Sequence, residues 1–373
     1  MFLAANCHIC GSATTVLSLP QEILTVTSDC KPWSDPLRLG RCDNCGQVQS
    51  VIDSTWILSS TEIYSNYESY FQSATKDQSV FSASGVDSRT AVFCRRALEV
   101  AQLDHGSVVL DWGCGTGNVA RCIRQARTDL RIHGLDLNDR HWVDGDLVSV
   151  IDEFHLAEIP DGLKFDLIVM SHSLEHVTNP VALLRNLSGH LSSGGRLAVV
   201  VPDCVNDPLK LVVADHCTHF SPGSLQSLLA RAGFSCESLG QEDSDREIQL
   251  LAWVENSLAS QNSDSSWVLR SIQNVLEAAR RLSEITDSTS QFGVFGTSIA
   301  GTWVLSEVKN HVVAFVDEDL GRVGRRFHDL PVLDPSQIPD SLVVVIPPMG
   351  QDSAKLASRL TFKYPTVRWV PIT

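Results

Sequence analysis

The stretch from residue 108 to residue 120, VVLDWGCGTGNVA, constrains the fold more than any other part of the sequence. An apolar run ends in Asp111 and Trp112, and Gly113, Gly115 and Gly117 then occupy alternate positions. Glycine permits the left-handed backbone angles of tight turns, and a short apolar run before such a turn is typical of a buried strand. We therefore predict a strand, a glycine turn and a helix, which together form a unit of parallel α/β structure.

This alternation of apolar runs with helical segments continues for about 150 residues, an ordinary length for one domain. Strands that alternate with helices favour a parallel, doubly wound sheet. The strands are expected at 108–112, 132–136, 165–170, 195–201 and 247–253, and the helices at 88–102, 117–127, 179–192 and 222–233.

Four cysteines near the start form two C-x2-C pairs, Cys7 with Cys10 and Cys42 with Cys45. Two such pairs supply the four thiolates that a structural zinc ion prefers, and full coordination by protein leaves no open position for catalysis. The pairs are unusually far apart, but the cost of closing a loop grows slowly with its length. We predict a structural zinc site, with Cys30 as a substitute ligand in an alternative arrangement.

A second, smaller α/β unit is expected at the end of the chain. Val268, Ile272 and Val275 recur at helical spacing, and FGVFG, VVAFVD, SLVVVI and TVRWV then follow as strand-like runs. The predicted division is a zinc-binding module at 1–53, a connector at 54–87, the main sheet at 88–255, a helical linker at 256–290 and a Rossmann-like domain at 291–373.

Composition narrows the class of protein. The 373 residues carry a formal charge of −15, which disfavours the basic surface that nucleic acids require. The first residues, MFLAANCHIC, lack the basic and apolar regions of a signal peptide, and no apolar run approaches the length of a membrane span. The 11 cysteines are an odd number and do not suggest a disulfide framework. A cytoplasmic protein without a membrane partner is expected.

The glycine turn also limits its ligand. The dinucleotide fingerprint needs glycine at position 118, where this sequence has Asn118. Asp111 is unfavourable beside a pyrophosphate and favourable beside a cation, and Asp136 ends the next predicted strand, where an acid can bind both ribose hydroxyls. Asp136 alone does not distinguish NAD from other adenosine ligands. Together, the two acids and the glycines favour S-adenosylmethionine.

Three stretches then resemble the class I S-adenosylmethionine-dependent methyltransferases: VVLDWGCGTGNVA, GLDLN and FDLIVMSHSLEHVTNPVALLRNLSGHLSSGGRLAVVVPD. The resemblance implies a central Rossmann-like sheet. It also implies that S-adenosylmethionine is bound by Asp111, Gly113, Cys114, Gly115, Gly117, Asp136, Leu137 and Ser171.

The order of the predicted domains resembles the nucleotide-sugar C-methyltransferases, which act on keto-deoxysugars carried by a nucleoside diphosphate. PLRLGRCDNCGQVQS, YFQSA and VVAFVDEDLGRVGRRFHDLPVLDP carry this resemblance, which covers almost the whole chain. Asp329 stands where the family has a glycine. The resemblance implies a nucleotide-linked 4-keto-deoxysugar as the methyl acceptor.

The same family implies the catalytic residues. A carbon beside a ketone becomes nucleophilic only after a base removes a proton. His216, after Asp215 in VADHCTHF, corresponds to the family's base, and His176 in LEHV and Tyr70 in YFQSA correspond to residues on the substrate side. Structural roles for these residues are the alternative. Val213 departs from the family, which often has tyrosine at this position.

The C-terminal unit offers further candidates. The turn GVFGTSIAG would direct a helix N-terminus at a diphosphate, and Asp317 would meet a ribose or a base. Arg322, Arg325 and Arg326 would offset phosphate charge, or would form a solvated surface. Two alternatives to C-methylation stay open: an O- or N-methyltransferase of another small molecule, and a non-catalytic zinc-containing binding protein. The oligomeric state is not specified by the sequence, and a monomer is compatible with it.

Overall fold

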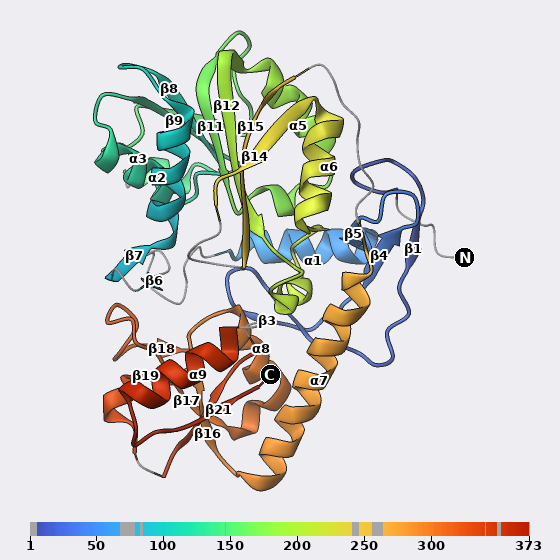
Figure 1. The fold of residues 1–373 in the computed structure, drawn as a ribbon, viewed down its shortest axis with the longest axis vertical. Helices are drawn as coiled ribbons and strands as arrows, with labels where there is room; N and C mark the ends of the chain where they lie inside the picture. Colours follow the sequence, from blue (N-terminus) through green and yellow to red (C-terminus); the bar gives the residue numbers. More distant parts are fainter. Residues whose placement is uncertain are drawn as a thin grey trace.

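A computed structural model describes residues 6–67, 79–82, 85–145, 147–240, 246–255, 264–339, 341–348 and 352–372. Figure 1 shows a large α/β body, a smaller α/β body below it, and N-terminal segments that run between and beside the two. Within the described ranges, no helix combines the length and apolar character needed to cross a membrane.

The large body is built on a seven-stranded sheet with the order β10-β9-β8-β11-β12-β15-β14. β15 runs antiparallel to both of its neighbours, β12 and β14, and the other pairings in this sheet are parallel. The strands are β8 (Val108–Trp112), β9 (Arg131–Asp136), β10 (Glu153–Leu156), β11 (Phe165–Ser171), β12 (Leu191–Pro202), β14 (Phe234–Ser238) and β15 (Glu247–Val254). The predicted parallel-rich sheet is confirmed, and its two edge strands, β10 and β14, were not predicted.

Helices cover both faces of this sheet because successive strand residues point to opposite sides. Val109 packs in the cluster that includes residues of α2 (Arg89–Ala101) and α3 (Asn118–Ala126), whereas Leu110 packs in the cluster that includes residues of α5 (Pro180–Gly189) and α6 (Pro222–Ala232). Between β9 and β10 only the four-residue helix α4 (Arg140–Val143) is described as helical.

The N-terminal segment is not a separate body. Its strands β1 (Thr14–Val16), β4 (Leu39–Cys42) and β5 (Val48–Ser50) form a sheet whose fourth strand, β13 (Thr218–His219), comes from the large body. A hairpin of β2 (Thr25–Val26) and β3 (Pro32–Trp33) contacts the C-terminal body, and α1 (Ser54–Ser65) lies across the middle of the molecule (Figure 1). The N-terminal segment therefore joins the other two parts.

The smaller body contains a six-stranded sheet with the order β18-β19-β17-β16-β20-β21. Its strands are β16 (Phe292–Phe295), β17 (Val312–Val316), β18 (Arg326–Phe327), β19 (Leu330–Leu333), β20 (Val343–Ile346) and β21 (Arg368–Pro371). The helices of this body are α7 (Trp267–Ser288), α8 (Ile299–Val308) and α9 (Asp352–Lys363). Elsewhere in the chain, a small hairpin of β6 (Ser79–Ser82) and β7 (Gly85–Ser88) precedes α2 of the large body. One apolar core contains Trp303, residues of α7 and N-terminal residues such as Val26, so α7 is packed and is more than a linker.

Candidate active site

The glycine turn joins β8 to α3 and is held by backbone hydrogen bonds. The N–H groups of Gly113 and Cys114 donate to the Leu135 carbonyl at 2.8 and 3.0 Å, and the N–H of Gly117 donates to the Cys114 carbonyl at 2.7 Å. All three glycines have positive φ angles. At Gly117 an added Cβ would lie 2.5 Å from Leu147 Cδ2, so both the backbone angle and the close approach require glycine here.

The two acids of the predicted cofactor site have different surroundings. Asp136 ends β9, is partly exposed, and accepts a hydrogen bond from the Gly115 N–H at 2.8 Å, so it meets the glycine turn directly. Asp111 is buried and accepts a hydrogen bond from the Ala120 N–H in the first turn of α3 at 3.2 Å. Burial raises the pKa of Asp111 to about 7. The turn and Asp136 together form an edge that can accept adenosine.

Three further residues predicted for the cofactor lie near this edge. Cys114 is buried inside the turn, and burial raises the pKa of its thiol above the usual range, as expected for a small packing residue. Ser171 is the last residue of β11 and is partly buried. Leu137 is 79% exposed, immediately after Asp136.

The predicted catalytic histidines lie together. His176 follows β11 in the short 3-10 helix η2 (Leu174–His176), and His216 lies between β12 and β13. Their rings pack edge to face with centroids 4.8 Å apart. Burial lowers the pKa of His216 well below its usual value, so its imidazole is neutral at physiological pH. A neutral imidazole is the form that can take up a proton.

Asp215 connects this pair to the N-terminal segment. Its carboxylate is fully buried and accepts hydrogen bonds from the Ser28 N–H at 2.8 Å and the Ser28 hydroxyl at 2.5 Å. The same carboxylate lies 3.4 Å from Nδ1 of His176, and the Asp215 carbonyl lies 3.1 Å from that nitrogen. The hydroxyl of Tyr64, on α1, is 2.8 Å from Nδ1 of His176. Burial, and then the charge of Asp215, raise the pKa of Tyr64, so this hydroxyl stays protonated.

Contacts from Val26, Ser50 and Trp56 also hold the segment that carries Asp215 and His216. Val26 forms a parallel bridge with Val213 and its carbonyl accepts the N–H of Ala214, while the Trp56 indole donates to the Ala214 carbonyl at 3.0 Å. The Ser50 hydroxyl donates a hydrogen bond to the carbonyl of His216 at 2.7 Å. Val213, where the family often has tyrosine, is buried against this N-terminal hairpin.

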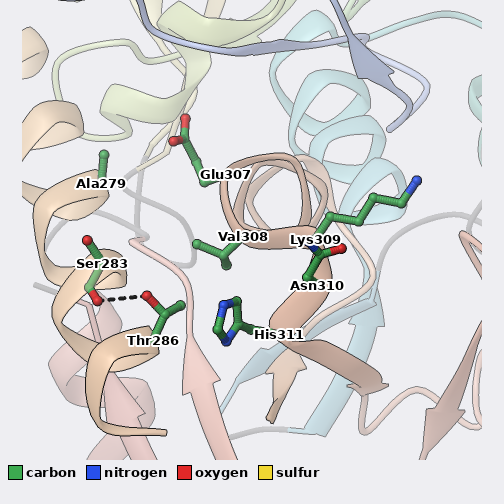
Figure 2. A pocket seen from close by; sticks show the side chains of 8 residues that line it. All are labelled: Ala279, Ser283, Thr286, Glu307, Val308, Lys309, Asn310 and His311. Atoms are coloured by element: carbon green, nitrogen blue, oxygen red, sulfur yellow. Dashed lines mark hydrogen bonds between the residues drawn. The ribbon is translucent and has the colours of Figure 1, made fainter. Parts of the chain in front are cut away.

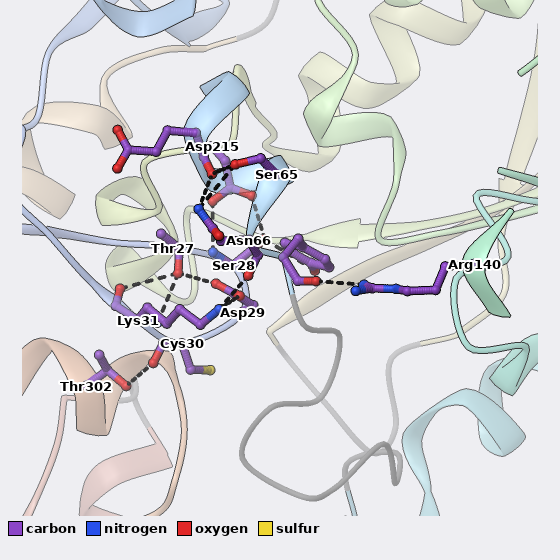
Figure 3. A network of polar contacts seen from close by, with 12 residues as sticks. Thr27, Ser28, Asp29, Cys30, Lys31, Ser65, Asn66, Arg140, Asp215 and Thr302 are labelled. Carbon is purple, nitrogen blue, oxygen red and sulfur yellow. Dashed lines mark hydrogen bonds and ion pairs between the residues drawn. The ribbon is translucent and has the colours of Figure 1, made fainter. Parts of the chain in front are cut away.

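Figure 3 shows how far this polar network extends. The turn 27–31 directs Ser28 toward Asp215, while the Thr302 hydroxyl of α8 donates to the Cys30 carbonyl at 3.1 Å. Lys31 donates to the carbonyl of Asn66 at the end of α1 at 2.7 Å. One short turn thus links the histidine pair, α1 and the C-terminal body.

A second set of charged side chains lies beside the histidines. His172, directly after β11, has a φ of 50° and bonds Oε1 of Glu247 at 2.9 Å. Burial and Arg89 lower the pKa of His172, but the carboxylates of Glu247 and Glu175 outweigh them and raise it overall. The Oε1 atom of Glu175 is 3.4 Å from Nδ1 of His172, whereas its Oε2 atom is buried without a hydrogen-bond partner among the described residues. Glu175 therefore retains a hydrogen-bond acceptor beside His176 and His216. One carboxylate oxygen of Glu175 and one ring nitrogen from each histidine lie within 4.8 Å of one another.

The four predicted zinc ligands converge. One ligand atom from each of Cys7, Cys10, Cys42 and Cys45 lies within 4.8 Å of the others. The two pairs have the same backbone geometry: Gly11 and Gly46 follow them with φ near 75°, at 74° and 76°, and each donates its N–H to the carbonyl of the first cysteine at 2.9 Å. The set of thiolates in tight turns fits a tetrahedral zinc ion. Cys30 lies outside this cluster, in the core shared with the C-terminal body.

The C-terminal candidates are arranged differently from the prediction. Arg322 is buried and its Nη1 lies 3.3 Å from Oδ2 of Asp317, so it does not form one exposed basic cluster with Arg325 and Arg326. Arg325 and Arg326 are exposed. The Asp317 carboxylate also accepts bonds from the N–H and the hydroxyl of Thr297, both at 3.0 Å, which shapes the turn before α8.

A pocket of about 370 Å³ lies in another part of the molecule, between α7 and the end of α8 (Figure 2). Its lining includes Ser283, Glu307 and His311, and none of the predicted site residues.

Tyr70 lies outside the described residues. Sequence reasoning missed Ser28, Tyr64 and Glu175 as site residues; only Glu175 had a local signal, since it precedes His176 in LEHV.

Residues 87–239 match the family model described as a methyltransferase domain. This stretch is similar to methyltransferase domains. The match confirms the predicted enzyme class, and it includes the glycine turn and both histidines of the candidate site. No curated protein matches the chain.

Three solved structures that are similar to the chain each cover less than half of it. An S-adenosylmethionine-dependent methyltransferase from Clostridium acetobutylicum ATCC 824 is 12% identical, with a TM-score of 0.38, over 45% of this chain and 93% of that one. The pyocyanin biosynthetic protein PhzM is 18% identical, with a TM-score of 0.37, over 44% and 54%. Human N-acetylserotonin methyltransferase in complex with SAM is 18% identical, with a TM-score of 0.35, over 43% and 51%.

Proposed function

We propose that this methyltransferase transfers the methyl group of S-adenosylmethionine to a carbon atom of a nucleotide-linked 4-keto-deoxysugar. The observation that carries the proposal is the pair of the partly buried His176 and the buried His216. Asp215 holds this pair near the strand ends that also bear the glycine turn and Asp136. Ligands of open α/β sheets bind outside the carboxyl ends of the strands. A base and a methyl donor at this edge can act on one substrate.

The donor site uses residues of β8, β9 and their turns. Asp136 would bind the ribose hydroxyls, and Gly113, Gly115 and Gly117 would let the backbone approach the ligand closely, with Cys114, Leu137 and Ser171 around it. Because burial raises the pKa of Asp111 to about 7, a cationic ligand nearby would shift this carboxyl toward its charged form. S-adenosylmethionine supplies such a cation and brings no pyrophosphate.

The acceptor chemistry needs a neutral base and a path for the proton. His216 would remove the proton from the carbon beside the ketone, and the C–H electron pair would form the enolate. The nucleophilic carbon then bonds to the sulfonium methyl as the carbon–sulfur bond breaks, which leaves S-adenosylhomocysteine. Asp215 and Glu175 would stabilise the imidazolium that forms, and the protonated hydroxyl of Tyr64 lies beside His176 in this site.

The smaller body would hold the nucleotide of the acceptor. It has the parallel order of a Rossmann-like half, and Gly296 turns from β16 toward α8 with a φ of 85°. An added Cβ at Gly301 would lie 2.2 Å from the Gly296 carbonyl oxygen, so the turn and the first turn of α8 meet too closely for any other residue. Helix N-termini favour phosphate groups. A diphosphate placed there would not need Arg322, which is already paired.

Zinc bound by Cys7, Cys10, Cys42 and Cys45 would have a structural role in this account. It would stabilise the turn after β4, and β5 of the same sheet pairs with β13, which begins two residues after His216. The metal would thereby support the segment that carries the base, without taking part in the reaction.

Mass spectrometry of nucleotide-linked 4-keto-deoxysugars after incubation with the protein and S-adenosylmethionine tests the proposal. We expect one of these sugars to gain a methyl group at carbon. Methyl gain at oxygen or nitrogen of another small molecule would favour the heteroatom alternative. Failure to bind S-adenosylmethionine would instead favour a non-catalytic binding protein.

A further inference from the structure

A second group of possible metal ligands lies at the edge of the large sheet, on β9 and β10. His133 is the third residue of β9, and Glu153 and His155 are the first and third residues of β10. The strands are parallel, with Glu153 paired to His133 and His155 paired to Leu135. Because side chains alternate along a strand, all three project from the same face of the sheet.

The contacts bring their ligand atoms together. Nδ1 of His133 and Nε2 of His155 are 2.9 Å apart, and one carboxylate reaches both rings: Oε2 of Glu153 is 3.9 Å from Nε2 of His133, and Oε1 is 4.0 Å from Nε2 of His155. One ligand atom from each residue lies within 4.8 Å of the others. Both imidazoles are buried, and Phe165 packs edge-on against His133. The Glu153 side chain is 45% exposed and also pairs with Arg131 at 3.3 Å.

We propose that His133, Glu153 and His155 bind a divalent zinc-like ion, at a site separate from the four cysteines and from the methyl-transfer site. Two neutral imidazoles and one carboxylate are a ligand set that zinc accepts, with its fourth position open to water on the exposed side of Glu153. Burial favours the neutral form of each imidazole, which leaves a lone pair for the metal.

Binding would replace two interactions. The hydrogen bond between the two imidazoles would give way to two bonds from nitrogen to metal, and Glu153 would exchange Arg131 for the ion. The backbone need not move, because the three ligand atoms already lie within 4.8 Å of one another and the half-exposed side chain of Glu153 can change rotamer. The histidine pair therefore forms a preorganised part of the site.

Such an ion would have a structural consequence for the donor site. It would fasten the edge strand β10 to β9 on the same strand pair that positions Asp136. Leu156 pairs with Asp136 in the strand register, and the N–H of Ala157 donates to the Asp136 carbonyl at 2.8 Å. We therefore expect the metal to rigidify the strand end that presents Asp136.

The test is to count zinc ions on the full chain after equilibrium dialysis against zinc chloride. The wild type is expected to hold one more ion per chain than His155→Gln, and the cysteine site cancels in this difference because both proteins retain it. Glu153→Gln changes a half-exposed residue, leaves the buried pair intact, and should weaken zinc binding at least about tenfold. His105→Gln, at an exposed histidine before β8, is the matched control and should bind as much zinc as the wild type.

Cobalt(II) provides a second readout that does not depend on the count. Cobalt at the new site should give visible absorption without thiolate charge-transfer bands, and this contribution should vanish in His155→Gln. Equal zinc content and equal cobalt spectra in wild type, Glu153→Gln and His155→Gln would overturn the proposal, and would leave the two imidazoles as a buried hydrogen-bonded pair.

Discussion

Replacing Ser28 with alanine tests whether the N-terminal segment positions the catalytic pair. Ser28 contributes its hydroxyl and its N–H to the buried carboxylate of Asp215, and that carboxylate faces His176. Ser28→Ala removes the hydroxyl and keeps the N–H bond, so Asp215 loses one of two hydrogen bonds from Ser28. The segment that carries His216 should then be less well oriented.

The magnitude follows from the burial of Asp215. A hydrogen bond to a charged group contributes about 1.5–3 kcal/mol, and Oδ2 of the buried carboxylate loses its hydroxyl donor in the variant. If most of this free energy orients the catalytic groups, kcat falls roughly 10- to 100-fold, since about 1.4 kcal/mol corresponds to a tenfold change in rate. The affinity for S-adenosylmethionine should change little, because Ser28 contacts neither the glycine turn nor Asp136.

Steady-state kinetics with the keto-sugar acceptor, together with calorimetry of S-adenosylmethionine binding, separates these effects. Ser28→Thr keeps a hydroxyl and should recover most of the activity. Ser65→Ala removes an exposed hydroxyl from α1 that bonds the Glu62 carbonyl and the Asn66 side chain, and should retain wild-type kcat. The reasoning is refuted if Ser28→Ala is as active as Ser65→Ala, or if threonine fails to rescue a variant that is folded.

Three further perturbations probe other parts of the molecule. Gly117→Ala should reduce the affinity for S-adenosylmethionine at least about tenfold in calorimetry, because it adds a clash with Leu147 to the cost of about 1–2 kcal/mol for a positive φ. The control Gly106→Ala has a similar φ and open space around it, so it should have only the backbone cost and bind S-adenosylmethionine normally. Burial lowers the pKa of His219 to about 3 in the folded protein. Below a pH of about 6.5 the unfolded chain therefore binds one more proton at His219 than the folded protein does. The free energy of unfolding should then fall by about 1.4 kcal/mol per pH unit as the solution is acidified toward pH ~4. In urea unfolding of His219→Gln, the decrease of the free energy of unfolding per pH unit should be smaller than in the wild type by about 1.4 kcal/mol. An equal pH dependence in the two proteins would contradict the burial argument. Cys42→Ser should remove one zinc ion per chain by atomic absorption and lower the melting temperature, whereas unchanged zinc content would exclude the four-cysteine site.

The sequence predicts the core of the large sheet well because its inner strands are continuous apolar runs. Strand β8 begins and ends as predicted, and β11 extends one residue beyond the prediction. The edge strand β10 was missed because Glu153 and His155 interrupt the apolar pattern in its four residues. Strand β13 has only two residues, and its pairing with β5 depends on contact between segments far apart in the chain.

The site shows the same division. Asp136, the glycines and the acid–histidine pair occur in local motifs, so their spacing or their resemblance to a family suffices to find them. Ser28 and Tyr64 have no motif, and their roles arise only when the β2–β3 hairpin and α1 fold against Val213 and Ala214. The ring of His8 bonds the Thr218 hydroxyl at 2.8 Å, because β13 joins the N-terminal sheet. Sequence spacing cannot predict such long-range pairings.

The central claim is that His216 removes a proton from the carbon beside a ketone. Its most direct measurement is deuterium uptake by a nucleotide-linked 4-keto-deoxysugar in heavy water, with S-adenosylhomocysteine present so that no methyl transfer can follow. The account predicts exchange at one carbon next to the ketone with the wild type, and loss of this exchange in a folded His216→Gln variant. Exchange that persists in the variant, or a wild type that methylates the sugar without any exchange, would contradict it.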